Sequence, residues 1–432
     1  MEKKFTYKIK SVVESLSIQL TRELTTGLRF RRRLLIIGLV GLFVVFIYFL
    51  KSVDLSPERI RDRSVKWIQP KFDFSVNRQP VVSHIQVANE TTIYVPLTVR
   101  RTDERKFRTT FVSIKCADRL EIAIVVIVYD NKTENEYVLP QSTLRCYAQA
   151  HNYPLIQVNL FDNPKYLKLC FGKDFMFQRH CVMAKLMEEY SHTEWFVFLD
   201  ADIGVVNPNH LLEEYTHPAA DLVFYDRLYN YEIMAGSYLS RNTQFARSFL
   251  RHWSSYEFKV REGTVHGTDN GAISEVFLDH FCASCAPLRR FRCTIIWKNS
   301  ESYDDLFRYE SCAREILGPA EWLRSTNGTL RQLSFGRDYW VRDGWQTGSK
   351  WCDKDFMFHG WKENKRDGEW KSMFTVEDFD SLNCKDPSTV HLAFAYKASF
   401  RAPVNEIRDR LMEVGRGSYD GHLKRLHEVN EI

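Results

Sequence analysis

Two aspartates, Asp200 and Asp202, follow the apolar run from Trp195 to Leu199. Five consecutive apolar residues, three of them aromatic, are typical of a strand that is buried on both faces. The i, i+2 spacing places both carboxylates on one face of an extended chain, within roughly 7 Å of each other. Carboxylates at the carboxyl end of such a strand suit a hard divalent cation that also binds a substrate diphosphate. A turn or a helix cap is the structural alternative.

A third metal ligand is expected from His359, which follows the short apolar run 356–358. Next to it, Gly360 lets the backbone approach a phosphate closely, and Lys362 supplies a positive charge for a diphosphate. The competing interpretation is a surface turn after a strand. A calcium loop of the helix–loop–helix kind is excluded at the aspartates, because its fifth position requires Asp or Asn and here holds Gly204.

Three more charged side chains are candidates for the same site. Asp269 lies in a polar, glycine-rich loop before a predicted apolar helix at 272–278. A carboxylate there either caps the helix or accepts a hydrogen bond from an acceptor hydroxyl. Arg179 and Lys185 lie on the predicted helix before the Asp200 strand, where they can neutralise phosphate or be ordinary solvated charges.

The segments that carry these residues alternate between strand and helix patterns. The expected strands lie at 121–129, 155–160 and 195–199, and the expected helices at 136–150 and 174–190. This order predicts an α/β fold with a mostly parallel central sheet and helices on both faces. Because the first strand closes at Tyr129 and Asp130, these two residues should converge with Asp200 on one crevice. Later strands are expected at 221–225 and 233–239 and a helix at 241–255, whereas 282–353 shows no clear pattern.

The composition allows one large globular domain with appendages, since the chain has 432 residues, 44% of them hydrophobic and 27% charged. The net charge of +5 is unevenly placed. Residues 1–33 carry nine Lys or Arg and three Glu, so the remainder is close to neutral. A nucleic-acid partner is therefore poorly supported.

The run 34–50 contains no charged residue and follows a cluster of arginines at 29–33. It predicts a single transmembrane signal anchor with a cytoplasmic tail at 1–33 and everything after it in the lumen. A cleaved signal peptide is disfavoured, because 33 residues precede the run and no small-residue cleavage site follows. We expect a stem at 51–117, a catalytic domain at 118–400 and a helical extension at 401–432.

Ten cysteines follow the predicted anchor, and an even number in an oxidising compartment predicts disulfides. Zinc is the weaker alternative, because the spacing of Cys282, Cys285, Cys293 and Cys312 fits no familiar finger. Three glycosylation sequons agree with a luminal domain. They begin at Asn89, Asn131 and Asn327.

The anchor, the stem and the Asp200-Ala-Asp202 strand end resemble the Golgi glycosyltransferases of the Rossmann-like GT-A fold. The stretch 234–243, which contains Gly236, is similar to a segment of the galactosyl- and xylosyltransferase families. Asp269-Asn270 resembles their acidic–amide pair, although Gln is usual at the second position. The residues 359–362 resemble their His…Gly…Lys segment in compressed form. The overall likeness, over about residues 118–400, is to a little-characterised nematode family of nucleotide-diphospho-sugar transferases.

The resemblance implies a Mn²⁺ ion, or a similar divalent cation, held by Asp200, Asp202 and His359 with the UDP of a UDP-sugar. It implies a hexose transferred to a glycan or glycoprotein in the Golgi or ER, with the anomeric configuration retained. Tyr129 and Asp130 would lie near the uridine. Positions nearer the diphosphate or the sugar are implied for Gly236, Asp269, Asn270, Gly360 and Lys362.

Three alternatives stay open from the residues alone. An inverting enzyme would need a general base, for which Asp269 is the best candidate. A catalytically inactive, membrane-anchored glycan-binding protein could keep the same fold. A phosphatase that uses Asp200 and Asp202 as nucleophile and acid is the third, although its motif normally closes the first strand of the sheet, and here two strands come before it.

Overall fold

The computed structural model describes residues 83–87, 90–94, 120–130, 135–333, 339–379 and 382–431. All of them belong to the second of two units, Trp67–Ile432, into which the chain divides after Met1–Lys66. The predicted tail at 1–33, the predicted anchor at 34–50 and most of the predicted stem lie outside the described residues. Within the described ranges, no helix is both long enough and apolar enough to span a membrane.

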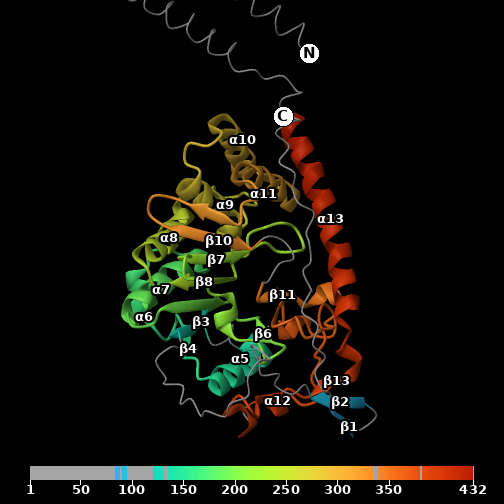
Figure 1. The fold of residues 1–432 in the computed structure, drawn as a ribbon. Coiled ribbons are helices and arrows are strands. Elements are labelled where there is room, and N and C mark those ends of the chain that lie inside the picture. The colour runs from blue at the N-terminus through green and yellow to red at the C-terminus, as the bar shows by residue number, and fades with distance from the viewer. Residues whose placement is uncertain are drawn as a thin grey trace, which may run out of the picture. The chain divides into compact units, whose positions relative to one another are not determined.

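The centre of the described part is a seven-stranded sheet with the order β4-β3-β5-β8-β7-β10-β9 (Figure 1). Its strands are β3 (Ile122–Val128), β4 (Leu155–Asn159), β5 (Trp195–Leu199), β7 (Leu222–Tyr225), β8 (Ser237–Arg241), β9 (Trp322–Arg324) and β10 (Thr329–Leu333). Five strands run in one direction. The exceptions are β8, which pairs antiparallel with β5 and β7, and β9, which pairs antiparallel with β10. The sheet is therefore mixed. The prediction of a mostly parallel sheet is confirmed in that most strands share one direction, but half of the strand pairings are antiparallel.

Both faces of this sheet are covered, as the uninterrupted apolar strands predict. Every residue of β3 and of β5 is buried. Trp195, Val197 and Leu199 pack into one hydrophobic core, whereas Phe196 and Phe198 point into a second core on the other face. Alternation along the strand thus divides the interior into two layers.

Helices from different parts of the chain fill these two layers. The second core contains residues of α7 (Phe175–Glu189), α8 (Gln244–Ser255) and α9 (Thr268–Phe281), and the first contains residues of α5 (Val138–His151). The helices expected at 136–150 and 174–190 are confirmed. Helix α9 begins four residues earlier than predicted, which places Asp269 and Asn270 in its first turn rather than in a loop.

Two small sheets accompany the central one. One has the order β11-β12-β6 and contains β6 (Gly204–Val205), β11 (Val341–Asp343) and β12 (Met357–His359). The other has the order β1-β2-β13 and contains β1 (Ser83–Val87), β2 (Glu90–Tyr94) and β13 (Tyr396–Lys397). In the first of these sheets, β12 pairs with β6 just after the two aspartates, with Phe358 opposite Gly204. This pairing brings residues 154 positions apart in sequence to one point.

The region 282–353, which showed no pattern in sequence, forms helices and short strands. It contains α10 (Pro287–Lys298), α11 (Tyr303–Leu317), β9, β10, β11 and the short helix η4 (Gly344–Thr347). Helix α13 (Val404–Glu431) packs against α11 and η4. The remaining helices are α6 (Pro164–Leu169), α12 (Val390–Ala393), η1 (Asn135–Tyr137), η2 (Leu212–Tyr215), η3 (Tyr256–Phe258), η5 (Glu363–Lys365), η6 (Leu382–Cys384) and η7 (Ala398–Phe400).

Four disulfides confirm the prediction that the cysteines are mostly paired. They join Cys146 to Cys384, Cys170 to Cys181, Cys282 to Cys285, and Cys293 to Cys312. The first closes a loop across 238 positions and ties α5 to the carboxyl-terminal part of the chain. Cys352 is a buried thiol, and Cys116 lies outside the described residues.

Candidate metal and nucleotide site

Asp200, Asp202 and His359 come together at one end of the central sheet. Each offers one ligand atom, and these atoms all lie within 4.8 Å of one another. Asp200 follows β5, and His359 closes β12, whose pairing with β6 aligns it with Asp202. His359 Nε2 is 3.5 Å from Asp202 Oδ1. Two carboxylates and an imidazole form a donor set that fits Mn²⁺ or a similar divalent cation.

Gly236 leaves the space that the Asp200 carboxylate occupies. The Asp200 amide donates to the Gly236 carbonyl at 2.8 Å, at the point where β5 and β8 pair. A Cβ atom at position 236 would lie 2.2 Å from Asp200 Oδ2. Glycine therefore leaves the room that the Asp200 carboxylate, a candidate metal ligand, occupies.

We expect Gly236→Ala to displace the Asp200 carboxylate and to weaken metal binding more than folding. Overpacking of this kind costs ~1–3 kcal/mol in the free energy of unfolding. Titration with Mn²⁺ and denaturant unfolding measure the two effects. Gly417→Ala is the matched control, because a Cβ on that glycine of α13 would meet nothing within 4 Å. Equal Mn²⁺ affinity in the two variants would contradict the role of Gly236.

Arg179 of α7 lies behind Asp200 and is almost completely buried. Its guanidinium donates to Asp200 Oδ1 and, through Nη2, to Asp269 Oδ2 at 2.6 Å. Burial raises the pKa of Asp200 to about 6, while Arg179 lowers it and the nearby Asp202 raises it further. A bound cation would favour the charged carboxylate, so this site gains electrostatically from a metal ion.

Asp269 is fully buried, with 0% of its surface exposed. Its Oδ2 atom accepts hydrogen bonds from Arg179 and from His180 Nε2 at 2.9 Å, and Oδ1 accepts from the Thr268 hydroxyl at 3.1 Å. Although burial raises the pKa of Asp269, Arg179 and His180 outweigh it and lower the pKa to about 2. This corrects the expected contact with sugar or acceptor, because the carboxylate faces Arg179 and positions it. Asn270, the next residue, is partly exposed.

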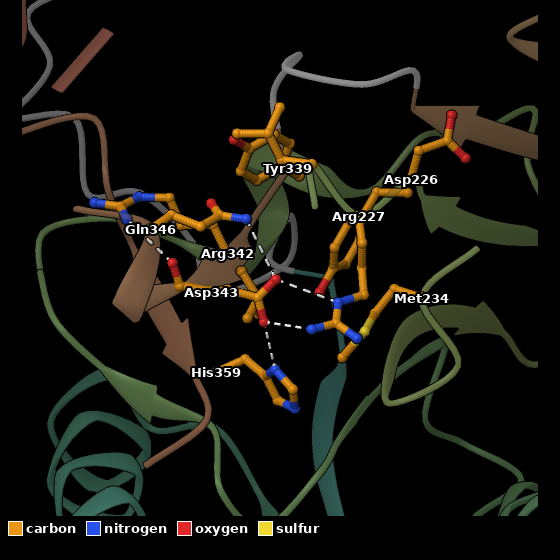
Figure 2. Close-up of a pocket in the computed structure, with 11 residues that line it drawn as sticks. Asp226, Arg227, Met234, Tyr339, Arg342, Asp343, Gln346 and His359 are labelled. Atoms are coloured by element: carbon orange, nitrogen blue, oxygen red, sulfur yellow. Dashed lines mark hydrogen bonds and ion pairs between the residues drawn. The ribbon is translucent and has the colours of Figure 1, made fainter. Parts of the chain in front are cut away.

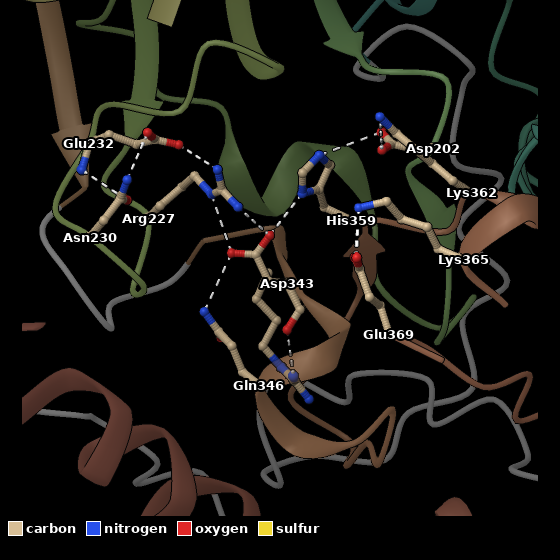
Figure 3. A network of polar contacts seen from close by, with 11 residues as sticks. Asp202, Arg227, Asn230, Glu232, Asp343, Gln346, His359, Lys362, Lys365 and Glu369 are labelled. Carbon is tan, nitrogen blue, oxygen red and sulfur yellow. Dashed lines mark hydrogen bonds and ion pairs between the residues drawn. The ribbon is translucent and has the colours of Figure 1, made fainter. Parts of the chain in front are cut away.

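His359 is oriented by a chain of ionic contacts (Figure 3). Its Nδ1 atom lies 2.8 Å from Asp343 Oδ1, which suits an Nδ1–H donor and leaves the Nε2 lone pair for a metal. Asp343 in turn accepts from Arg227 Nη2 at 2.8 Å and Nε at 3.2 Å, and Arg227 also pairs with Glu232. Burial lowers the pKa of His359, but Asp202 and Asp343 raise it more. Arg227, Asp343 and Glu232 thus hold the imidazole in place.

These supporting residues have little signature in the sequence. Asp343 closes β11 in the region without a clear pattern, and its partner Arg227 is 116 positions away. The only signal was the short apolar run Trp340-Val341, which is followed within two residues by a carboxylate. His180 was also missed, although it stacks on Trp253 at 3.5 Å between ring centroids and contacts Asp269.

Gly360 and Lys362 lie at the edge of the cluster. Lys362 Nζ is 4.0 Å from Asp202 Oδ2, and its side chain is 41% exposed. The Trp361 amide donates to the Asp202 carbonyl at 3.0 Å, which fixes this turn against the aspartates. Gly360 adopts a φ of +96° with open space around it, as a close approach by a ligand requires.

A pocket lies at the carboxyl ends of β3 and β4. Val126, Val128, Tyr137, Gln141, Gln157, Val158 and Asn159 line it. Gln141 Nε2 donates to the Ala201 carbonyl at 2.7 Å, so the pocket adjoins the residues between the two aspartates. Burial and the charge of Asp202 raise the pKa of Tyr137 to about 12.

Of the other predicted site residues, two lie at the end of β3 and one lies away from the metal cluster. Tyr129 follows β3, is 48% exposed, and contacts Phe175 edge to face at 5.9 Å between ring centroids. Asp130 follows it at the same strand end. Lys185 differs, because it points along α7 to Glu188, 3.1 Å away, and the described structure gives it no contact with the metal cluster. The structure therefore does not bring Lys185 to the site.

Comparisons with known proteins identify one matching family and several solved structures of low similarity. The family model described as "Protein of unknown function, DUF273" matches residues 144–375, more than half of the chain. No curated protein matches the chain in sequence.

Two of the similar solved structures are a glycosyltransferase involved in glycosylation of the major capsid of PBCV-1 and the apo-form glycosyltransferase GlyE of Streptococcus pneumoniae TIGR4. The first is 16% identical with a TM-score of 0.28, over 36% of this chain and 73% of that one. The second is 14% identical with a TM-score of 0.27, over 37% and 44%. Likenesses at this level carry no argument about activity.

Proposed function

Because the chain belongs to the DUF273 family, whose description names no activity, we propose its function from the site: a glycosyltransferase that binds a nucleotide-sugar donor through a divalent cation. The observation that carries the proposal is the convergence of Asp200, Asp202 and His359 within 4.8 Å. The cluster lies at the carboxyl end of β5, where open α/β sheets bind ligands. Mn²⁺ fits this donor set, and when bound it would stabilise the charge of a leaving diphosphate.

The neighbouring pocket supports a nucleoside as part of the donor. Amide side chains of Gln141, Gln157 and Asn159 line it beside apolar residues, as a site for a flat polar base requires. The exposed Tyr129 adds an aromatic ring at the same strand end. Lys362 places a positive charge near the aspartates, where a diphosphate would follow the nucleoside. We propose a UDP-hexose as the donor and a glycan or glycoprotein as the acceptor.

The burial of Asp269 favours retention of configuration. An inverting reaction needs a general base within hydrogen-bond reach of the acceptor hydroxyl. Asp269 was the best candidate in sequence, but it is completely enclosed and bonded to Arg179 and His180. In a retaining reaction, the acceptor oxygen bonds to the anomeric carbon as the bond to the diphosphate breaks, and a leaving phosphate oxygen takes the acceptor proton. Arg179 would then orient the Asp200 carboxylate, and His359, held by Asp343, would bind the cation. Both residues would position the donor in this way.

A panel of nucleotide sugars incubated with the full-length chain and Mn²⁺ tests the proposal. We expect slow hydrolysis of one UDP-hexose, with loss of activity when EDTA removes the cation. Hydrolysis of phosphomonoesters in place of nucleotide sugars would favour the phosphatase. Glycan binding without turnover of any donor would identify an inactive binding protein of the same fold.

We further propose that residues 34–50 anchor the chain as a single-pass, type II protein of the Golgi or ER membrane. The support is the charge-free apolar run preceded by the arginines at 29–33. Protease added to sealed microsomes is expected to remove the tail and to spare everything after about Ser52. Digestion of the large domain in unbroken vesicles would rule out this orientation.

A further inference from the structure

Two aromatic side chains, Tyr229 and Trp345, form an exposed pair on the surface. Their ring centroids are 5.3 Å apart with an interplanar angle of 80°, and 45% and 40% of their surfaces are exposed. Nine of the ten tryptophans lie in the described part of the chain, and Trp345 is the only one of these among the exposed large side chains. Exposure of two large aromatic rings at one place costs hydrophobic free energy and marks a binding surface.

The pair lies beside a pocket that shares His359 with the metal cluster. Figure 2 shows the residues that line this pocket, which include Arg227, Gln346 and His359 but not the two rings themselves. Tyr229 directly follows Leu228, and Trp345 directly precedes Gln346, and both of these neighbours line the pocket. The Arg227 guanidinium is 5.9 Å from the Tyr229 ring centroid and also bonds the Asp343 that holds His359. The pocket therefore lies on the Nδ1 side of the imidazole, whereas Asp202 lies on the Nε2 side.

The surroundings hold the pair rigidly. The Ser418 hydroxyl of α13 contacts the Leu228 and Tyr229 carbonyl oxygens at 2.7 and 2.6 Å. On the other side, Arg410 of α13 donates to the Gln346 carbonyl at 3.3 Å. Both rings thus project from backbone that α13 fixes, so little conformational freedom would be lost when a ligand binds.

Gln346 supplies an independent sign of a missing ligand. Its side chain is only 2% exposed, and within the described part of the chain its Oε1 atom has no hydrogen-bond partner. Its Nε2 atom makes a long contact, 3.4 Å, with Asp343 Oδ2. A buried carbonyl oxygen without a donor is unfavourable, and a ligand hydroxyl would satisfy it.

We propose that Tyr229, Trp345 and Gln346 form the subsite for the acceptor glycan. Sugar rings have an apolar face of C–H groups and an edge of hydroxyls, and aromatic rings beside a hydrogen-bond acceptor match both. The subsite would lead the acceptor toward His359 from the side opposite Asp202. This inference rests on the proposed glycosyl transfer for the identity of the ligand, but its geometry is independent of the donor.

An array of neutral and acidic oligosaccharides probed with the full-length chain tests this subsite. The wild type is expected to bind a defined set of glycans. Trp345→Ala should weaken that binding about 10-fold or more, as expected for an aromatic anchor, whereas Trp345→Phe should retain part of it. Phe291→Ala is the matched control, because Phe291 of α10 is also an exposed aromatic ring, 65%, and lies outside the pocket.

Unchanged glycan binding by Trp345→Ala, or no glycan binding by the wild type, would overturn the subsite. A parallel titration with UDP and Mn²⁺ distinguishes this failure from a failure of the proposed function. Trp345-dependent glycan binding without any UDP binding would support the subsite and contradict the transferase. Loss of both glycan and UDP binding in Trp345→Ala and in Trp345→Phe would show a general structural role and overturn the specific one.

Discussion

Asp202→Ala is expected to abolish Mn²⁺-dependent binding of UDP and to lower the turnover of donor by at least ~10²–10³. The substitution removes one of three ligand atoms that lie within 4.8 Å of one another. It also removes the carboxylate that faces His359 Nε2 and Lys362 Nζ, so Lys362 loses its counter-charge. Calorimetric titration with UDP and Mn²⁺ and a donor-hydrolysis assay measure the two effects.

The fold of Asp202→Ala should remain intact, because its side chain lies at a strand end and outside both hydrophobic cores. Asp162→Ala is the control, since Asp162 is an exposed carboxylate after β4. Normal UDP affinity in Asp202→Ala, with or without Mn²⁺, would contradict the claim that a cation held by Asp202 binds UDP.

Asp269→Asn is expected to destabilise the protein by ~3 kcal/mol, the lower end of the cost of removing one partner from a buried ion pair. The amide keeps the shape of the carboxylate but leaves the buried Arg179 guanidinium with Asp200 as its one charged partner among the residues that the structure describes. Denaturant unfolding near pH 7 measures the effect. Asp304→Asn, which alters an exposed pair with Arg308, should change stability by no more than ~1 kcal/mol.

The cost of Asp269→Asn should depend on pH in a defined direction. The folded-state pKa of Asp269, about 2, lies below the ordinary value of an aspartate. Its ionised form therefore contributes stability that is present above about pH 4 and is lost as the pH falls toward 2. The difference between wild type and variant should narrow over that interval. A constant difference would show that Asp269 acts through packing rather than charge.

The elements before the two aspartates could be predicted because each carries its own periodicity. The apolar runs of β3 and β5 and the helical patterns of α5 and α7 are local properties of the sequence. The direction of β8 could not be predicted from the sequence, because the apolar run at 233–239 does not encode whether a strand runs parallel or antiparallel to β5. Its start at Ser237 is set by pairing with Leu199, a tertiary contact.

The candidate metal ligands could be predicted from the sequence, but the residues that orient them could not. Asp200, Asp202 and His359 each follow an apolar run, and that signal is visible in sequence. The partners Arg227 and Asp343 form their contact across 116 positions, which no local pattern reveals. The glycines before α9 predict a loop around Asp269, whereas the residue lies in the first turn of that helix and helix packing encloses it completely.

The most direct test of the central claim is calorimetric titration of the full-length wild-type chain with UDP, in the presence and in the absence of Mn²⁺. If Asp200, Asp202 and His359 hold a cation that in turn holds the diphosphate, binding should be measurable with Mn²⁺ and should disappear when EDTA replaces it. UDP binding of equal strength without any divalent cation, or no UDP binding in either condition, would contradict the account.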